Sequence, residues 1–423
     1  MNCEKLGFGA AEILLPDFTK VDGTSWAVVA CDQYTSEPQY WREAEDRVGD
    51  APSTLRMILP EVYLEESESR IKAINLEMER ILSETLTAYP NAMICLCRTQ
   101  SDGRVRCGII GAVDLECYDY HAGATSLIRA TEGTVLERIP PRVAIRRNAA
   151  LELPHVMLLI DDPDRTVIEP TVSACEGRQP LYDFDLMQGG GHACAYLLTE
   201  NEQAEVSRAL SALITPDAMQ ARYGDASLSP LLFAVGDGNH SLATAKATYE
   251  EVKAAIGKEA AKAHPARYAL TEVVNLHDKA LEFEPIYRVV FGCDPDALLA
   301  ELQAVTAALN GNAAAQEMVC ITAEREFTLT VAHPEQQLTV GTLQAFLSDY
   351  AARHPEVTVD YIHGEDSLRA LAKQPNAVGF LFDGMRKDEL FRTVIYDGAL
   401  PRKTFSMGHA ADKRYYIEAR RIK

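Results

Sequence analysis

The chain has 423 residues, enough for two or three domains at roughly 150 residues each. Hydrophobic residues make up 47% of it, which supplies a sizeable core and excludes a chain that is disordered throughout. The 41 Lys and Arg residues are outnumbered by 62 Asp and Glu residues, so the formal net charge is −21. Because that charge repels nucleic-acid backbones and anionic lipid surfaces, we expect no nucleic-acid partner and no membrane partner.

The sequence also lacks signals for membrane insertion and export. No apolar run approaches the roughly 20 residues of a membrane helix, and the first residues do not resemble a secretory signal. The 10 cysteines are irregularly spaced, and no second Cys/His pair has the spacing of a zinc site. We therefore expect a cytoplasmic protein whose cysteines are reduced and mostly buried.

Hydrophobic periodicity predicts strands and helices in alternation. In chain order, the predicted elements are strand 26–31, helix 66–88, strands 92–98, 105–113, 156–161 and 193–198, helix 200–213, strand 231–235, helices 242–255 and 295–309, strands 318–321 and 327–331, helix 343–352, strand 357–362, helix 367–373, and strands 378–382 and 393–396. Asp294 followed by Pro295 is a clear helix start. The pattern predicts a mixed α/β fold.

Boundaries between domains are weakly marked, because the chain has no low-complexity linker and no internal repeat. The best seams lie at 88–91 and 291–295. They predict an N-terminal α/β unit over 1–90, a central core over 91–290, and a C-terminal α/β unit with a basic tail over 291–423.

The clearest local pattern is FAVGDGNHSLATA at 233–245, a buried strand followed by a glycine loop and an amphipathic helix. A glycine loop at a helix start presents unpaired backbone N–H groups, and the helix dipole favours an anion there. Asn239, His240 and Ser241 add polar side chains, whereas Asp237 would repel a phosphate unless it holds Mg²⁺ or accepts a proton from a substrate hydroxyl. The alternative is an Asp-Gly turn in which Asn239 or Ser241 caps the helix.

Two basic stretches interrupt the acidic background. Residues 129–147 contain five arginines, among them Arg129 and Arg138, and the turn between these two holds Glu132, a candidate base. Guanidinium groups suit the capture of phosphate or carboxylate, although pairing with surface carboxylates is the alternative. Near the C-terminus, Lys403 and Thr404 fall in a second basic cluster, which is either an anion-binding wall or a solvated tail.

Four stretches together resemble the prokaryotic family known as domain of unknown function 1015: RATEGTVLERI, FAVGDGNHSLATA, LEFEPIYRVV and LPRKTFSMGHAADKRYYIEARRI. In the family the loop usually reads Asp-Gly-His-His-Arg. Asp237, Gly238 and His240 match it here, whereas Asn239 and Ser241 replace a histidine and the arginine. Glu132 and Thr134 fall in the family's His-Glu-x-Thr element. Arg138 and Arg288 fall on family arginines, and Lys403 and Thr404 fall on its C-terminal Pro-x-Lys-Ser/Thr stretch.

The loop is also similar to that of ParB/sulfiredoxin-like proteins, which include free-serine kinases. This resemblance implies a ParB/sulfiredoxin-like core with a large insertion. It implies Glu132 as the base for a serine hydroxyl and Asp237 as a ligand of metal or hydroxyl, with His240 as a further catalytic residue. It also implies a group of residues that bind phosphate or substrate: Gly238, Asn239, Ser241, Arg129, Thr134, Arg138, Arg288, Lys403 and Thr404.

The leading hypothesis is therefore a phosphotransferase that acts on a small hydroxy amino acid, similar to a free-serine kinase. Its cofactor would be Mg²⁺, and its phosphoryl donor ATP, ADP or pyrophosphate. One alternative is a phosphatase that hydrolyses phosphoserine in the same phosphate cradle. Another is a nucleotide-binding regulatory switch without turnover. The sequence gives no oligomeric state.

Overall fold

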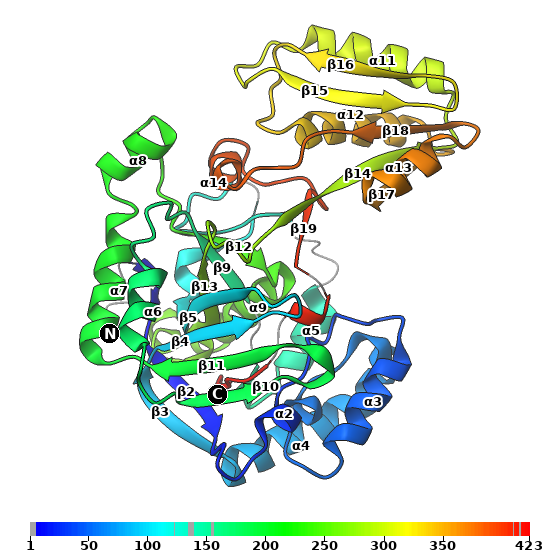
Figure 1. Cartoon of the computed structure of the whole chain (residues 1–423). Helices are drawn as coiled ribbons and strands as arrows, with labels where there is room; N and C mark the ends of the chain where they lie inside the picture. The colour runs from blue at the N-terminus through cyan, green and yellow to red at the C-terminus, as the bar shows by residue number, and fades with distance from the viewer. Residues whose placement is uncertain (1–5, 122, 134–138, 154–155, 409, 414–415) are drawn as a thin grey trace. The chain divides into compact units, whose positions relative to one another are not determined.

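A computed structural model of the chain describes residues 6–121, 123–133, 139–153, 156–408, 410–413 and 416–423 (Figure 1). Contacts between Cα atoms divide it into two units. Unit 1 contains residues 1–130, 134–281 and 408–423, and unit 2 contains residues 131–133 and 282–407. The predicted mixed α/β class is confirmed. The division differs from the three consecutive segments expected from the sequence, because the last residues return to unit 1.

Unit 1 is built on a ten-stranded mixed sheet in the order β10-β11-β4-β5-β13-β9-β12-β7-β6, with β1 paired to β5. The sheet strands are β1 Phe8–Gly9, β4 Ile94–Thr99, β5 Val105–Asp114, β6 Tyr118–Asp119, β7 Ile128–Ala130, β9 Met157–Ile160, β10 Tyr182–Asp185, β11 His192–Leu197, β12 Phe233–Asp237 and β13 Tyr268–Asn275. Two small pairs accompany it: β2 Ala11–Pro16 with β3 Leu86–Ala92, and β8 Leu151–Glu152 with β20 Arg420–Arg421. β12 is parallel to β7 and antiparallel to β9.

The large sheet has a hydrophobic core on each face. Consecutive strand residues point to opposite faces, so Ile110 belongs to one cluster and Ile109 to the other. The first cluster contains Trp26 and Trp41 from the N-terminal helices, together with Tyr416 from the C-terminal segment. The helices of unit 1 are α2 Gly23–Trp26, α3 Pro38–Val48, α4 Ser67–Glu84, α5 Ile139–Arg146, α6 Ile168–Cys175, α7 Glu200–Ala212, α8 Pro216–Tyr223, α9 Asn239–Ile256 and α10 Lys258–Ala261.

Unit 2 has a six-stranded sheet in the order β16-β15-β18-β14-β17, with β19 also paired to β14. Its strands are β14 Phe283–Phe291, β15 Gln316–Ile321, β16 Glu326–Val331, β17 Thr358–His363, β18 Ala377–Leu381 and β19 Phe405–Met407. Its helices are α11 Pro295–Ala308, α12 Thr339–Arg353, α13 Glu365–Ala372 and α14 Lys387–Tyr396. Asp294 caps α11 by accepting from the backbone N–H groups of Asp296 and Ala297, as the sequence predicted.

Three predicted elements are wrong. The strand expected at 393–396 is the end of α14, whose buried residues Leu390, Phe391 and Val394 follow helical spacing. The strand expected at 26–31 is a buried stretch that follows α2 without pairing in a sheet. The helix expected over 66–88 ends at Glu84, because the following residues pair with β2 as strand β3.

The sequence analysis missed two central strands, β13 and β14. Each contains a charged residue that tertiary partners make tolerable in a core. Glu272 of β13 binds Arg106 of β5 at 2.8 Å, and Arg288 of β14 is fully buried. Charge within a strand disrupts the apolar run by which buried strands are recognised.

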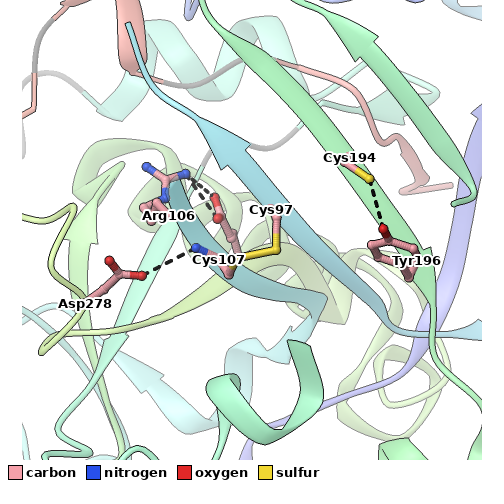
Figure 2. The surroundings of a disulfide bond; sticks show 7 residues. Cys97, Arg106, Cys107, Cys194, Tyr196 and Asp278 are labelled. Carbon is pink, nitrogen blue, oxygen red and sulfur yellow. Dashed lines mark hydrogen bonds and ion pairs between the residues drawn. A yellow bond between two sulfur atoms is a disulfide. The ribbon is translucent and has the colours of Figure 1, made fainter. Parts of the chain in front are cut away.

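The expectation of reduced cysteines is wrong for one pair. Cys97 of β4 and Cys107 of β5 lie directly opposite each other, 4.2 Å apart at Cα, and form a disulfide (Figure 2). Neighbouring strands bring together two residues that sequence spacing had not linked. Among the described residues, no helix is long and apolar enough to cross a membrane.

Candidate functional site

The glycine loop joins β12 to α9 in unit 1. Gly236 packs so closely on β9 that a Cβ there would lie 2.7 Å from Cγ of Leu159, so a side chain at this position would clash. Gly238 has φ = +83°, a left-handed conformation that glycine adopts without a steric penalty. Its backbone N–H donates to Oδ1 of Asp237 at 2.8 Å, which orients this carboxylate. These glycines turn the chain directly from strand into helix.

The polar residues of the loop occupy the first turn of α9. The helix begins at Asn239, and Asn239, His240 and Ser241 are all half-buried, as is Asp237 at the end of β12. The 18-residue helix is held by a buried face that includes Leu242. The strand–loop–helix junction that the sequence predicted is therefore present, with Asp237 at the end of the strand and the three polar residues in the first turn of the helix.

Arg129 of β7 was predicted to bind substrate, but its side chain donates hydrogen bonds to backbone carbonyls. Its strand runs parallel to β12, and its side chain is buried. Nε donates to the carbonyl of Ser126 at 2.8 Å, and Nη2 donates to the carbonyls of Ser229 and Pro230 at 2.9 and 3.2 Å. Burial lowers the pKa of Arg129. The structure thus shows this guanidinium bracing the segment that leads into β12.

The rest of the basic stretch is mostly paired. Arg146 binds Glu152, and Arg147 binds Glu251 at 2.8 Å. Arg142 likewise binds Glu61. The alternative of pairing with carboxylates thus holds for these three arginines. Thr134 and Arg138, also predicted to bind substrate, lie outside the described residues.

A cavity of about 190 Å³ in unit 1 adjoins the first turns of α9. Ser241 and Thr244 line it together with apolar side chains and the buried carboxylate of Glu152. Although burial opposes it, the charges of Arg420 and Arg146 lower the pKa of Glu152. Sequence analysis missed Glu152, because one of its two arginines, Arg420 of β20, is 268 residues away in the sequence.

Unit 2 contains the other predicted residues. Glu132 is half-buried and forms an isolated β-bridge with Leu400, whose backbone N–H donates to the carbonyl of Thr131 at 2.7 Å. Thr404 is buried, and its hydroxyl donates to the carbonyl of Pro401 at 2.7 Å. Lys403 is exposed and has φ = +54°, a left-handed conformation that is rare for a residue with a side chain.

Arg288 holds the segment that contains Lys403. Its Nη1 donates to the carbonyl of Lys403, and its Nη2 donates to the carbonyl of Arg402, both at 3.1 Å. Nη1 also donates to the carbonyl of Ile286 at 2.6 Å. Burial lowers the pKa of Arg288 to about 10, opposed by the charges of Tyr361 and Glu132. Arg288, predicted to bind substrate, instead holds the backbone that positions Lys403.

Tyr361 is a member of this cluster that sequence analysis missed. It lies opposite Arg288 in the β14–β17 ladder. The Arg288 guanidinium lies 4.5 Å from its ring centroid, and Nζ of Lys403 lies 4.8 Å from it. Both contacts are cation–π interactions. Because its partners come from β14 and from the segment before β19, no local sequence signal identifies it.

The predicted metal site has only one carboxylate. No group of three or more His, Cys, Asp or Glu residues is placed to hold a metal ion in the part of the chain that the structure describes. Mg²⁺ binds to proteins through one or two carboxylates and fills its remaining positions with water and substrate phosphates. Asp237, half-buried at the end of β12, is the carboxylate that the sequence assigned to Mg²⁺, and this assignment stays a prediction.

Comparison with known proteins assigns the family. The model of the family described as protein of unknown function (DUF1015) matches residues 16–350, and the chain belongs to this family. A search of curated proteins finds no match. Among solved structures, a conserved hypothetical protein from Pyrococcus furiosus is 10% identical, with 71% of this chain and 90% of that chain covered and a TM-score of 0.35.

A variant of a free serine kinase in complex with ADP is also similar. It is 10% identical, with 76% of this chain and 93% of that chain covered and a TM-score of 0.38. A C-terminally truncated SbnI from Staphylococcus aureus has 10% identity, coverage of 71% and 82%, and a TM-score of 0.33. At TM-scores this low, the likeness carries no inference about activity.

Proposed function

We propose that this protein transfers a phosphoryl group to the hydroxyl of a small hydroxy amino acid, with serine as the first substrate to test. The observation that carries the proposal is the β12–α9 junction of unit 1. It puts a left-handed glycine, a half-buried carboxylate and three polar residues at the start of an 18-residue helix. The resemblance of this loop to that of free-serine kinases adds the substrate class.

The loop supplies the phosphate-binding groups. The first N–H groups of α9 and the positive end of its dipole favour an anion, and Gly238 allows close approach to the backbone. Asn239, His240 and Ser241 add side-chain contacts in this proposal. Asp237 would hold Mg²⁺ together with the donor phosphates and water, and the cation would offset their negative charge.

Glu132 is proposed as the base. The serine hydroxyl oxygen bonds to phosphorus, the bond from phosphorus to the leaving oxygen breaks, and its electron pair stays with the donor. The hydroxyl proton goes to Glu132, and such proton transfer typically contributes about 10²–10⁴-fold to a rate. Lys403, whose charge lies in the same unit as Glu132, is available for the carboxylate of the amino acid.

The test is phosphorus NMR on the full chain with Mg²⁺ and L-serine, with ATP, ADP or pyrophosphate in separate tubes, and with phosphoserine alone in another. Phosphoserine formed from one donor supports the proposal and identifies the donor. Phosphate released from phosphoserine alone reassigns the same loop to hydrolysis. No reaction in any tube overturns the serine assignment.

A pair of variants ties turnover to the loop. Asp237→Asn is expected to lower turnover by at least about 10²-fold while the far-UV circular dichroism stays unchanged. The matched control is Asp217→Asn, an exposed aspartate in the first turn of α8, which should keep full activity. A folded and fully active Asp237→Asn protein would remove Asp237 from the mechanism.

A further inference from the structure

Three cysteines of unit 1 stand in one row across neighbouring strands. Cys97 of β4 lies opposite Cys107 of β5 on one side and opposite Cys194 of β11 on the other. Cys97 and Cys107 form the disulfide, whereas Cys194 is a free thiol (Figure 2). All three are half-buried, so small thiol reagents have access to the row.

The row places three cysteines side by side on one face of the sheet. Residues directly opposite each other in antiparallel strands point to the same face, and neighbouring strands are about 4.8 Å apart. Cys97 therefore has a cysteine on each side of it. In exchange, a thiolate attacks one sulfur of a disulfide and the other sulfur leaves. Cys194 stands on the side of Cys97 opposite to the leaving group, Cys107.

Hydrogen bonds and ion pairs fix the polar groups around Cys194. The thiol of Cys194 donates to the hydroxyl of Tyr196 at 3.4 Å, which orients the thiol. Asp183 lies opposite Cys194 in β10, but its carboxylate is bound by Nε2 of His192 at 2.6 Å. Nδ1 of His192 is bound to Asp185 at 2.7 Å, so this one histidine of β11 holds both carboxylates of β10.

The other cysteines of the same face are less suited to exchange. Cys95 is two residues before Cys97 in β4, but it is fully buried and its burial raises its pKa. Cys175, at the end of α6, is also buried, and burial raises its pKa. A buried neutral thiol is a poor nucleophile. The exchange chemistry therefore centres on the half-buried row.

We propose that Cys194, Cys97 and Cys107 form an exchange-active thiol–disulfide site in which Cys97 is the shared sulfur. The Cys194 thiolate bonds to Sγ of Cys97, the Cys97–Cys107 bond breaks, and its electron pair leaves on Cys107. The proton released by Cys194 is matched by one taken up at Cys107, and no net oxidation occurs. The cross-link moves from β4–β5 to β4–β11, and low-molecular-weight thiols and disulfides are the class of reactant that enters the row. The site is independent of the phosphoryl-transfer proposal.

The first test traps the second cross-link. The full-length Cys107→Ser variant is incubated with oxidised glutathione, which supplies the oxidant, and digested without reduction for mass spectrometry. A peptide pair joined through Cys97 and Cys194 is the expected product. A folded variant that carries glutathione on either cysteine, or free thiols at both, without that pair overturns the proposal.

The second test uses the native disulfide, so it tests the exchange even if the Cys107→Ser variant does not fold. The wild-type protein is labelled with iodoacetamide without reductant, and exchange should expose Cys107 to the reagent. We expect labelling of Cys107 to fall at least about tenfold in Cys194→Ser. Cys117→Ser, which removes a half-buried cysteine outside the row, should label Cys107 as the wild type does. Complete labelling of Cys194 with none on Cys107 contradicts exchange.

Discussion

The two groups of predicted site residues are built in different ways. In unit 1, Asp237 to Ser241 are consecutive, and two glycines shape the turn that presents them. In unit 2, the position of the exposed Lys403 side chain depends on Arg288 of β14, which is fully buried and donates to the carbonyl of Lys403. A substitution in the loop thus changes chemistry directly, whereas a substitution at Arg288 acts through the fold.

That difference has an energetic basis. Loss of Arg288 would leave the buried carbonyl of Ile286 without this donor, and an unsatisfied buried polar group costs about 1–3 kcal/mol. Asp237 is only half-buried and keeps access to water. Stability measurements therefore separate the two groups, and the substitutions below compare buried with exposed charges in the two units.

The largest effect is expected for Arg288→Met. Loss of the bonds to Ile286, Arg402 and Lys403 should lower the free energy of unfolding of unit 2 by roughly 3 kcal/mol or more. Urea titration followed by far-UV circular dichroism measures it. Both tryptophans of the chain, Trp26 and Trp41, lie in unit 1, so their fluorescence reports that unit separately.

The control for this substitution is Arg325→Met. Arg325 makes an exposed ion pair with Asp296 in unit 2, and such pairs contribute about 0–1 kcal/mol. An Arg288→Met protein as stable as this control would contradict the bracing role of Arg288. An equal shift of the tryptophan transition would show that the effect is not confined to unit 2.

The next largest effect concerns a buried carboxylate of unit 1. Burial raises the pKa of Glu418 to about 7, although a hydrogen bond from Tyr182 opposes the shift. The folded protein then holds a proton that the unfolded chain releases near pH 4.5, so stability falls as pH rises from about 4.5 through 7. Glu418→Gln should remove this loss and be more stable than wild type at pH 8, by roughly 2–3 kcal/mol.

Tryptophan fluorescence during urea unfolding at pH 5 and pH 8 measures the effect. Trp26 is a suitable probe, because its indole donates at 2.9 Å to the carbonyl of Ile417, the residue before Glu418. Glu152→Gln is the contrasting variant: Arg420 and Arg146 lower the pKa of Glu152, so its charge stabilises the fold at neutral pH. This variant should be less stable than wild type at pH 8. Equal pH dependence in wild type and Glu418→Gln would refute the raised pKa.

The smallest effect is expected at Lys403. Its left-handed backbone costs a residue with a side chain about 1–2 kcal/mol, and glycine avoids this cost. The greater flexibility of glycine in the unfolded chain offsets part of this gain, so Lys403→Gly should raise the stability of unit 2 by about 0.5–1 kcal/mol. Lys403→Ala, which removes the same charge without relieving the backbone, is the control. Circular dichroism during urea unfolding compares them, and equal stability of the two would contradict the strain.

Much of the fold was predictable from the sequence, and the errors occurred where an apolar pattern was interrupted or short. Helix α11 was predicted from its cap and its first proline, and the strand–loop–helix order around Asp237 from its apolar run and glycines. The strand β14 was missed because Pro285 and the buried Arg288 interrupt its apolar pattern. The segment 393–396 was misread as a strand because a short run of Thr, Val, Ile and Tyr does not distinguish strand from helix.

By itself, the sequence determined the α/β class, most of the regular elements and the loop at 237–241, because these depend on periodicity, caps and glycines within a few residues. Only the tertiary structure decided that Arg288 holds Lys403 beside Tyr361, and that Cys97 stands between Cys107 and Cys194. In both cases, partners come from segments that are distant in sequence. The pairing of strands that are distant in sequence depends on the packing of the whole sheet, which no local pattern encodes.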